Sequence, residues 1–120
     1  IDNQPQLNKQ EQKSGFHLQA RDLIKSIYPL DILLEEVFLP GSNGLYIDFY
    51  LPNRKKMIEV QGEQHYKFIP YFHRDILGFL RSKRRDKNKQ EWAEINKLSM
   101  IYLPFNDIMN WSKYIIYGND

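Results

Sequence analysis

The stretch Tyr46 to His65, YIDFYLPNRKKMIEVQGEQH, decides how the rest of the chain is interpreted. It predicts two β-strands, at Tyr46–Leu51 and Lys56–Gln61, because both runs have the composition of strands. The residues Pro-Asn-Arg-Lys between them are typical of a tight turn. The sequence therefore predicts a hairpin at the centre of the fold.

Two acids of this hairpin are predicted to lie next to each other. Successive side chains of a strand point to opposite faces, so the first strand carries Ile47, Phe49 and Leu51 on one face and Tyr46, Asp48 and Tyr50 on the other. The second strand carries Met57, Glu59 and Gln61 on one face. Asp48 and Glu59 can then sit side by side, where two carboxylates repel unless a cation lies between them. A divalent metal ion is the natural candidate, and the backbone carbonyl of Val60 would add a neutral oxygen ligand.

The composition indicates one globular domain. The chain has 120 residues, of which 42% are hydrophobic and 14% are aromatic. No run approaches the roughly 20 apolar residues of a membrane span, so we expect no membrane association. The lack of cysteine excludes disulfides and thiolate metal sites and fits a reducing cytoplasm.

Residues 1–13 are rich in Gln, Asn and Lys and are predicted to be a tail or linker, with the folded domain at residues 14–120. The chain begins with Ile and shows no signal-peptide pattern. It is either a mature product or a fragment. We favour a fragment, to which a separate DNA-recognition domain could have been attached at this end.

The predicted element order is helix, three strands, helix, strand and helix. Ser14 can cap a first helix with the apolar stripe Phe16, Ala20, Leu23, Ile24 and Ile27, and His17 lies off this stripe, as a surface residue would. The remaining elements are predicted at Ile32–Leu39, at about Ser82–Leu98, at Ser99–Leu103 and after Asn106. This order predicts an α/β fold with a mixed sheet flanked by helices on both faces.

The basic residues are concentrated in one segment. From Arg81 to Lys89, six of nine residues are Lys or Arg, and Asp86 is the only acid. A basic segment near an acidic cluster suits an enzyme that acts on a polyanion, although a charge run can also be a solvated helix face. The residues predicted to contact nucleic acid are Arg81, Lys83, Arg84, Arg85, Lys87 and Lys89, together with His73.

Four motifs in the segment from about residue 14 to 105 resemble those of the PD-(D/E)xK nuclease superfamily: IDFYLP, IEVQGEQHY, RRDKNK and IYLPF. The resemblance is strongest to the very-short-patch-repair-like branch, in particular to the phage homing endonucleases of the EDxHD group. Each motif is short, but four in the right order are fairly specific. The resemblance implies a restriction-endonuclease-like αβββαβ core, double-stranded DNA as the partner, and strand cleavage that depends on Mg²⁺, with Mn²⁺ as the alternative ion.

The resemblance also implies roles for single residues. Asp48 resembles the metal-binding aspartate, and Glu59 the acid of the (D/E)xK strand. Gln61 stands where that motif usually has lysine; an amide can orient water but brings no positive charge, which Lys89 could supply. His65 resembles the histidine of the EDxHD pattern and would act as the base or stabilise the attacked phosphate.

The two remaining acids of the pattern have competitors in this chain. Asp86 resembles the closing aspartate, with Asp75 as the alternative. Glu36 is preferred over Glu35 as the leading glutamate on resemblance alone, since only one of two consecutive strand residues can face the site. Other branches carry this acid on the first helix, where this chain has His17 and Gln19.

These observations predict the catalytic domain of a DNA endonuclease in a bacterial or phage-infected cell. A mismatch-nicking or junction-resolving nuclease of the same fold is one alternative, and a non-cleaving DNA-binding module with a decayed site is another. Cutting both strands requires two active sites or sequential nicking, so a homodimer is one suitable assembly. The aromatic residues Tyr66, Phe68, Tyr71 and Phe72 are expected in the core more than on a base-stacking surface.

Overall fold

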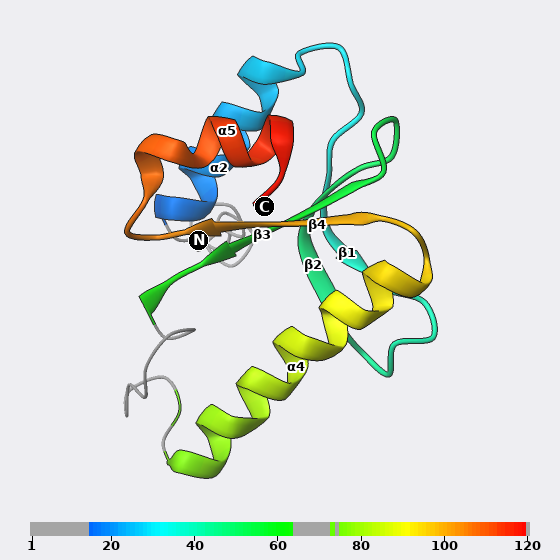
Figure 1. Cartoon of the computed structure of the whole chain (residues 1–120), viewed down its shortest axis with the longest axis vertical. Helices are drawn as coiled ribbons and strands as arrows, with labels where there is room; N and C mark the ends of the chain where they lie inside the picture. Colours follow the sequence, from blue (N-terminus) through cyan, green and yellow to red (C-terminus); the bar gives the residue numbers. More distant parts are fainter. Residues whose placement is uncertain (1–14, 64–72, 74, 120) are drawn as a thin grey trace, which may run out of the picture.

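The chain folds into a four-stranded sheet with helices on both faces (Figure 1). The computed structural model describes residues 15–63, 73 and 75–119. Its elements are α2 (Gly15–Ile27), β1 (Leu34–Phe38), β2 (Tyr46–Leu51), β3 (Lys56–Gln61), α4 (Ile76–Ile95), β4 (Ser99–Pro104), the 3₁₀ helix η2 (Ile108–Asn110) and α5 (Trp111–Tyr117). The predicted order of helices and strands is confirmed, and the predicted hairpin has the observed bounds.

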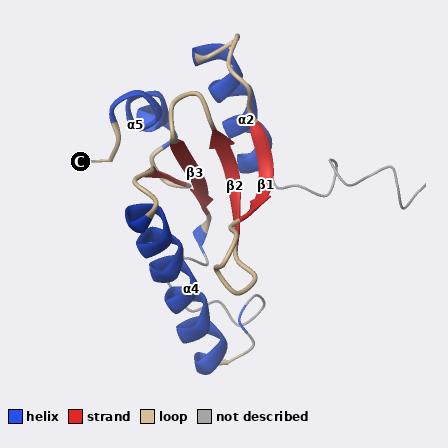
Figure 2. Cartoon of the chain, turned by 90° about the vertical axis from the view of Figure 1, so that its right-hand side faces the viewer, coloured by secondary structure: helices blue, strands red, loops and turns tan. Residues whose placement is uncertain are grey.

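The sheet is mixed, as predicted. Its strand order is β1-β2-β3-β4, with antiparallel pairing from β1 to β3 and parallel pairing of β3 with β4. Two neighbouring parallel strands need a long crossover connection, and α4 lies within the connection from β3 to β4. The crossover carries α4 to the face of the sheet opposite α2 and α5 (Figures 1 and 2).

The larger core lies between the sheet and the helices α2 and α5. Its buried residues from the helices are Ala20, Ile24, Trp111 and Ile115, and those from the strands are Phe49, Leu51, Ile58, Ile101 and Leu103. Phe16, Leu23 and Ile27 pack against this core, so the predicted stripe of the first helix is confirmed. Burial of large apolar side chains stabilises the fold by about 1.5–3 kcal/mol for each.

The opposite face of the sheet packs on α4 through a smaller core, formed by Leu39, Leu45, Ile47, Met57 and Ala93. Ile47 was predicted to share a face with Phe49 and Leu51, which is wrong, because it belongs to this second core. The pairing of β2 with β3 runs from Leu51 to Phe49, so Ile47 lies where only β1 still pairs with β2.

Helix α4 begins earlier than predicted. It starts at Ile76 rather than near Ser82, because Asp75 caps it: the Asp75 carboxylate accepts a hydrogen bond of 2.8 Å from the Gly78 amide. Ala93 is its buried residue, and its N-terminal half projects beyond the sheet (Figures 1 and 2). In the described ranges, no helix combines the length and apolar character that a membrane crossing requires.

Two other boundaries differ from prediction. Strand β1 is shorter than the predicted Ile32–Leu39. Asn106 was predicted to cap the last helix, which is wrong: a 3₁₀ turn intervenes, and the cap positions belong to Asp107 and Asn110. The Asp107 carboxylate accepts hydrogen bonds from Asn110 and from the Tyr114 hydroxyl, so it joins the turn to α5. Ser14, the predicted cap of the first helix, and residues 1–13 lie outside the described residues.

Candidate active site

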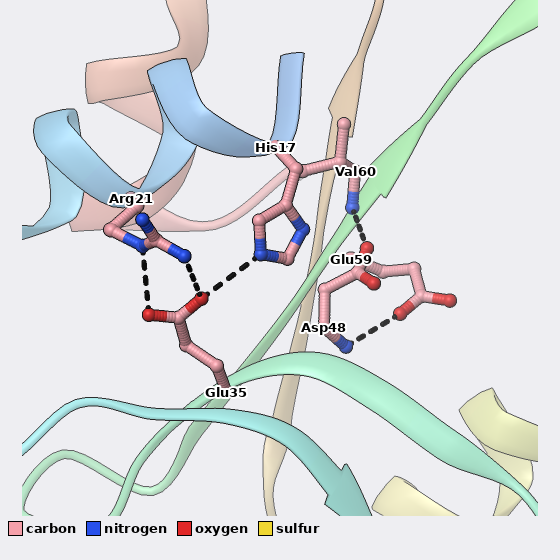
Figure 3. Close-up of polar contacts among 6 residues, drawn as sticks. All are labelled: His17, Arg21, Glu35, Asp48, Glu59 and Val60. Atoms are coloured by element: carbon pink, nitrogen blue, oxygen red, sulfur yellow. Dashed lines mark hydrogen bonds and ion pairs between the residues drawn. The ribbon is translucent and has the colours of Figure 1, made fainter. Parts of the chain in front are cut away.

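The candidate site lies where β2 separates from β3. Their ladder pairs Leu51 with Lys56, Tyr50 with Met57, and Phe49 with Ile58. At the next position, side chains replace the backbone ladder (Figure 3). The Asp48 amide donates to the Glu59 carboxylate at 3.1 Å, and the Val60 amide donates to the Asp48 carboxylate at 2.8 Å. The two predicted acids are therefore neighbours: the Asp48 amide holds the Glu59 carboxylate, and the Val60 amide holds the Asp48 carboxylate.

The electrostatics of this pair are unfavourable for two free carboxylates. Glu59 is only 5% exposed. Burial, followed by the negative charge of Asp48, raises the pKa of Glu59 from its ordinary value of 4.5 to about 7, although Lys89 and the Asp48 amide act in the opposite direction. An additional positive charge at this point would be stabilising.

Part of that charge comes from Lys89. The Lys89 ammonium lies 2.6 Å from the second oxygen of the Glu59 carboxylate, and the two side chains are 16% and 6% exposed. Lys89 reaches the site from α4, and Glu59 from β3. Lys89 thus brings a positive charge next to Glu59. A lysine at position 61, two residues further along β3, would bring the same charge, but this chain has Gln61 there.

A cleft of about 360 Å³ adjoins the carboxylates and is lined by Glu36, Tyr46, Ile47, Asp48 and Lys89. Glu36 stands across from Asp48 in the register of β1 and β2, between the paired positions Glu35–Phe49 and Val37–Ile47. Its φ angle of 51° is in the left-handed region, which is rare for a non-glycine residue within a strand. Glu36, the acid preferred from the sequence, therefore shares a cleft with Asp48.

Glu35, the competing acid, faces the other way, toward α2 (Figure 3). Arg21 donates two hydrogen bonds to its carboxylate, at 2.8 and 2.9 Å, and the Nε2 atom of His17 lies 3.1 Å from it. Burial alone would raise the pKa of Glu35, but the hydrogen bonds and charges of Arg21 and His17 outweigh it and lower that pKa. This cluster of His17, Arg21 and Glu35 ties α2 to β1.

The prediction that His17 is a surface residue is wrong. His17 is 5% exposed, and its ring stacks on that of Phe49 with centroids 4.5 Å apart. Its position next to the apolar stripe of α2 did not reveal this burial, since the partner Glu35 comes from a different element. His17 thus supports Glu35 rather than the pair Asp48 and Glu59.

Asp86 lies on α4, and its charge acts on Tyr102, as that of Glu59 does; its competitor Asp75 caps the helix. Burial first, and then the charges of Asp86, Glu59 and Glu94, raise the pKa of Tyr102 to about 12. Tyr102 pairs with Glu59 across β3 and β4, and its hydroxyl is 3.3 Å from the Gln90 amide oxygen. Tyr102 was not predicted as a site residue. The alternation of side chains along β4 could have indicated it, because a strand paired with β3 places one of its faces next to Glu59.

The other predicted site residues have varied positions. Gln61 ends β3 at a half-buried position, and its carbonyl accepts a hydrogen bond of 2.8 Å from the Phe105 amide. His73 is 7% exposed and packs edge-on against Phe79, so its contact with phosphate stays a prediction. His65 and the aromatic residues Tyr66, Phe68, Tyr71 and Phe72 lie outside the described residues.

The predicted DNA-contacting residues share one helix. Arg81, Lys83, Arg84, Arg85 and Lys87 are all exposed on α4, whereas the half-buried Lys89 turns to Glu59. The basic segment therefore begins on the projecting half of α4 and ends at the carboxylates.

The donor set of the site fits a hard divalent cation. Asp48 and Glu59 offer carboxylate oxygens, and their mutual repulsion in a buried setting would be relieved by a bound cation. Within the described residues no three His, Asp or Glu side chains converge as a metal-binding group. Two carboxylates nevertheless match the usual protein share of a Mg²⁺ site, where water and substrate phosphates complete the shell.

The comparisons with known proteins show two viral relatives. Over 68 residues the chain is 40% identical to the uncharacterized protein 307L of Invertebrate iridescent virus 6, a match covering 54% of this chain and 34% of that protein. Over 63 residues it is 32% identical to the uncharacterized protein 033L of Invertebrate iridescent virus 3, covering 52% and 32%. The matches thus span about a third of each relative. No family model matches the chain, and no solved structure does.

Proposed function

We propose that this domain is a metal-dependent DNA endonuclease of the PD-(D/E)xK type, with the αβββαβ chain order serving as a restriction-endonuclease-like core. The observation that carries the proposal is the meeting of Asp48, Glu59 and Lys89 at the end of the β2–β3 ladder. Two acids and one lysine beside a cleft and a basic helix are groups suited to metal-assisted phosphodiester hydrolysis.

Asp48 and Glu59 would hold Mg²⁺, with the Val60 carbonyl as a third donor. The bound ion would supply Lewis-acid activation of the phosphate and of the attacking water. Val60 and Asp48 already orient the two carboxylates through their amides, so little rearrangement is needed to present the oxygens. Glu36 would act from the opposite wall of the cleft, as an acid that contacts the attacking or leaving group through water.

Lys89 would provide the positive charge that Gln61 lacks. In the structure it neutralises Glu59; with a cation on Glu59, its ammonium would be available to the scissile phosphate in the same cleft. Gln61 would orient water, and His65, by resemblance, would be the base or stabilise the phosphate. Asp86 would position His65 or a water from α4.

The basic half of α4 would hold the DNA backbone. The half of α4 that carries these exposed lysines and arginines extends past the sheet, where a long polyanion could lie along it (Figure 1). Binding carried by phosphate contacts weakens steeply as salt rises. A weak salt dependence would therefore argue against this role of α4.

The test is cleavage of supercoiled plasmid with and without Mg²⁺ by the wild type and Asp48→Asn. Asparagine keeps an acceptor for the Val60 amide and removes the charge, so the fold should persist while cleavage is lost. Asp22→Asn, an exposed substitution on α2, is the matched control and should cleave like the wild type. Wild-type cleavage by Asp48→Asn would refute the proposed site.

A second candidate is a non-cleaving DNA-binding module. The direct Lys89–Glu59 contact favours it, because in a site that no longer binds a metal ion a lysine could take the place of that ion. Calorimetric titration with Mg²⁺ or Mn²⁺ separates the two. Uptake of the ion that Asp48→Asn abolishes supports the nuclease, and DNA binding without uptake of either ion supports the module.

A further inference from the structure

Two aromatic rings stand exposed at the edge of the cleft. Phe38 of β1 and Tyr46 of β2 face each other in the register of the two strands, with ring centroids 5.5 Å apart. They are 45% and 56% exposed. Their rings are inclined by 60° to each other, and both are exposed enough to contact a further flat group.

The position of this pair relates it to the carboxylates. Tyr46 lines the cleft together with Asp48 and Lys89. Tyr46 and Asp48 are two residues apart in β2, about 7 Å along the strand, and both line the cleft. A phosphate located between Asp48 and Lys89 would thus have its neighbouring nucleoside next to the Tyr46 ring.

The chemistry of the cleft selects a nucleobase as the group that the ring would contact. An apolar peptide would place its backbone beside the charges of Glu36, Asp48 and Lys89, which is costly without matched partners. A nucleotide brings a phosphate for the lysine and the cation, and a flat base for the aromatic ring. The cleft volume of about 360 Å³ is at the lower end of the range of small-molecule sites, which accommodates one nucleotide unit.

A base inside a regular duplex is stacked on both sides and cannot reach such a ring without being extruded. We propose that Tyr46, with Phe38 behind it, is a stacking subsite for an unpaired base next to the phosphodiester that is cut. The substrate class is DNA with unpaired nucleotides at the cleavage point, in preference to fully paired duplex. This inference rests on the proposed nuclease function and specifies its substrate.

The experiment compares two oligonucleotide duplexes of one sequence, one fully paired and one with a central unpaired segment. Binding is measured in Mg²⁺-free buffer, and cleavage in Mg²⁺. A 2-aminopurine in the unpaired segment reports stacking, because its fluorescence falls when it stacks on an aromatic ring. The wild type should prefer the unpaired substrate by roughly 5- to 150-fold, the value of one base–aromatic contact.

The variants identify the ring. Tyr46→Leu should lose most of this preference and the fluorescence change, while its affinity for the paired duplex stays within about twofold, since phosphate contacts are kept. Tyr46→Phe should keep both, because the ring remains. Tyr117→Leu removes an aromatic residue that is 81% exposed on α5, in the other layer, and should match the wild type.

The outcomes separate this inference from the proposed function. If the wild type cuts both duplexes equally and Tyr46→Leu changes neither, the stacking subsite is refuted and the nuclease function stands. If Tyr46→Leu weakens binding to both duplexes equally, the ring contacts something other than an unpaired base, and the inference is refuted as well. If the wild type binds and cuts neither duplex, both proposals fail.

Discussion

Two acidic clusters lie on opposite faces of the sheet, among strands β1, β2 and β3. One faces α2 and the other faces α4. The α2 cluster has one carboxylate, Glu35, with Arg21 and His17 around it. The α4 cluster has two carboxylates, Asp48 and Glu59, with Lys89 as the cation that contacts Glu59. In both clusters an acid on a strand contacts a cation on a helix. They differ in the number of negative charges relative to positive charges.

The difference in balance appears in the pKa values. The pKa of Glu35 is lowered, because its hydrogen bonds and cations outweigh burial. The pKa of Glu59 is raised to about 7, because burial and the Asp48 charge outweigh Lys89. An acid such as Glu35, whose charge is balanced by its partners, stabilises a fold. An acid such as Glu59, which lacks sufficient positive charge around it, is typical of functional sites. The comparison favours a structural role for the α2 cluster and agrees with the proposal of a chemical role for the α4 cluster.

The largest expected effect is on cleavage. Glu59→Gln should lower the cleavage rate by roughly 10²- to 10³-fold, because it removes one of the two carboxylates that would hold the cation stabilising charge at the reacting phosphate. Glu35→Gln should leave the rate unchanged at temperatures well below its unfolding transition. Single-turnover cleavage of plasmid DNA measures both. Equal losses in the two variants would remove the distinction between the clusters.

The next effect concerns Lys89. Lys89→Met should lower the cleavage rate by roughly 10- to 100-fold, as expected for a residue that hydrogen-bonds a metal-binding carboxylate. Lys25→Met, at an exposed position of α2, is the control. Adding Gln61→Lys to Lys89→Met should restore part of the rate, because position 61 shares the face of Glu59 on β3. Restoration by Gln61→Lys also excludes a purely structural role for Lys89.

A smaller effect is expected on the free energy of unfolding, and here the α2 cluster should matter more than the α4 cluster. Glu35→Gln should lower the free energy of unfolding by about 1–2 kcal/mol, because the half-buried Arg21 loses its charged partner. Asp48→Asn should leave it unchanged or raise it, because the repulsion of Glu59 is removed and the acceptor for the Val60 amide is kept. Urea unfolding at pH 7 measures both. A greater loss for Asp48→Asn would mean that the pair is stabilising as it stands.

A further expected effect is a pH dependence of opposite sign in the two clusters. The pKa of Glu59 is above its ordinary value of 4.5, so the folded state binds the extra proton and the contribution of Glu59 to stability falls as pH rises from about 4.5 to about 7. Glu35, with its lowered pKa, contributes stability above its ordinary pKa, which is lost as pH falls below it. Urea unfolding at pH 5 and pH 7.5 should show the first trend in the wild type and not in Glu59→Gln.

Much of the hairpin was predictable from local pattern. The bounds of β2 and β3 agree with prediction, and Met57 and Ile58 pack on opposite faces as alternation requires. The stripe of the first helix was also predictable, because a period of 3.6 residues determines which side chains share a face. The cap of α4 at Asp75, three residues before Gly78, was not recognised.

The parts of the site that come from separate elements were less predictable. His17 looked like a surface residue, since its burial depends on Glu35, eighteen residues away. The choice of Glu36 over Glu35 rested on resemblance, and the left-handed φ of Glu36 appears only in the folded strand. Phe38 and Tyr46 were not singled out as a pair, because their contact depends on the register of β1 with β2.

The sequence by itself determined that Asp48 and Glu59 would be presented on matching faces of a hairpin, because alternation and turn length are properties of neighbouring residues. Only the tertiary structure decided which cation meets them. Lys89 lies thirty residues beyond Glu59, and the crossover to the parallel strand β4 brings α4 across that face of the sheet. Charge balance in a buried site is set by such distant contacts, which local periodicity does not contain.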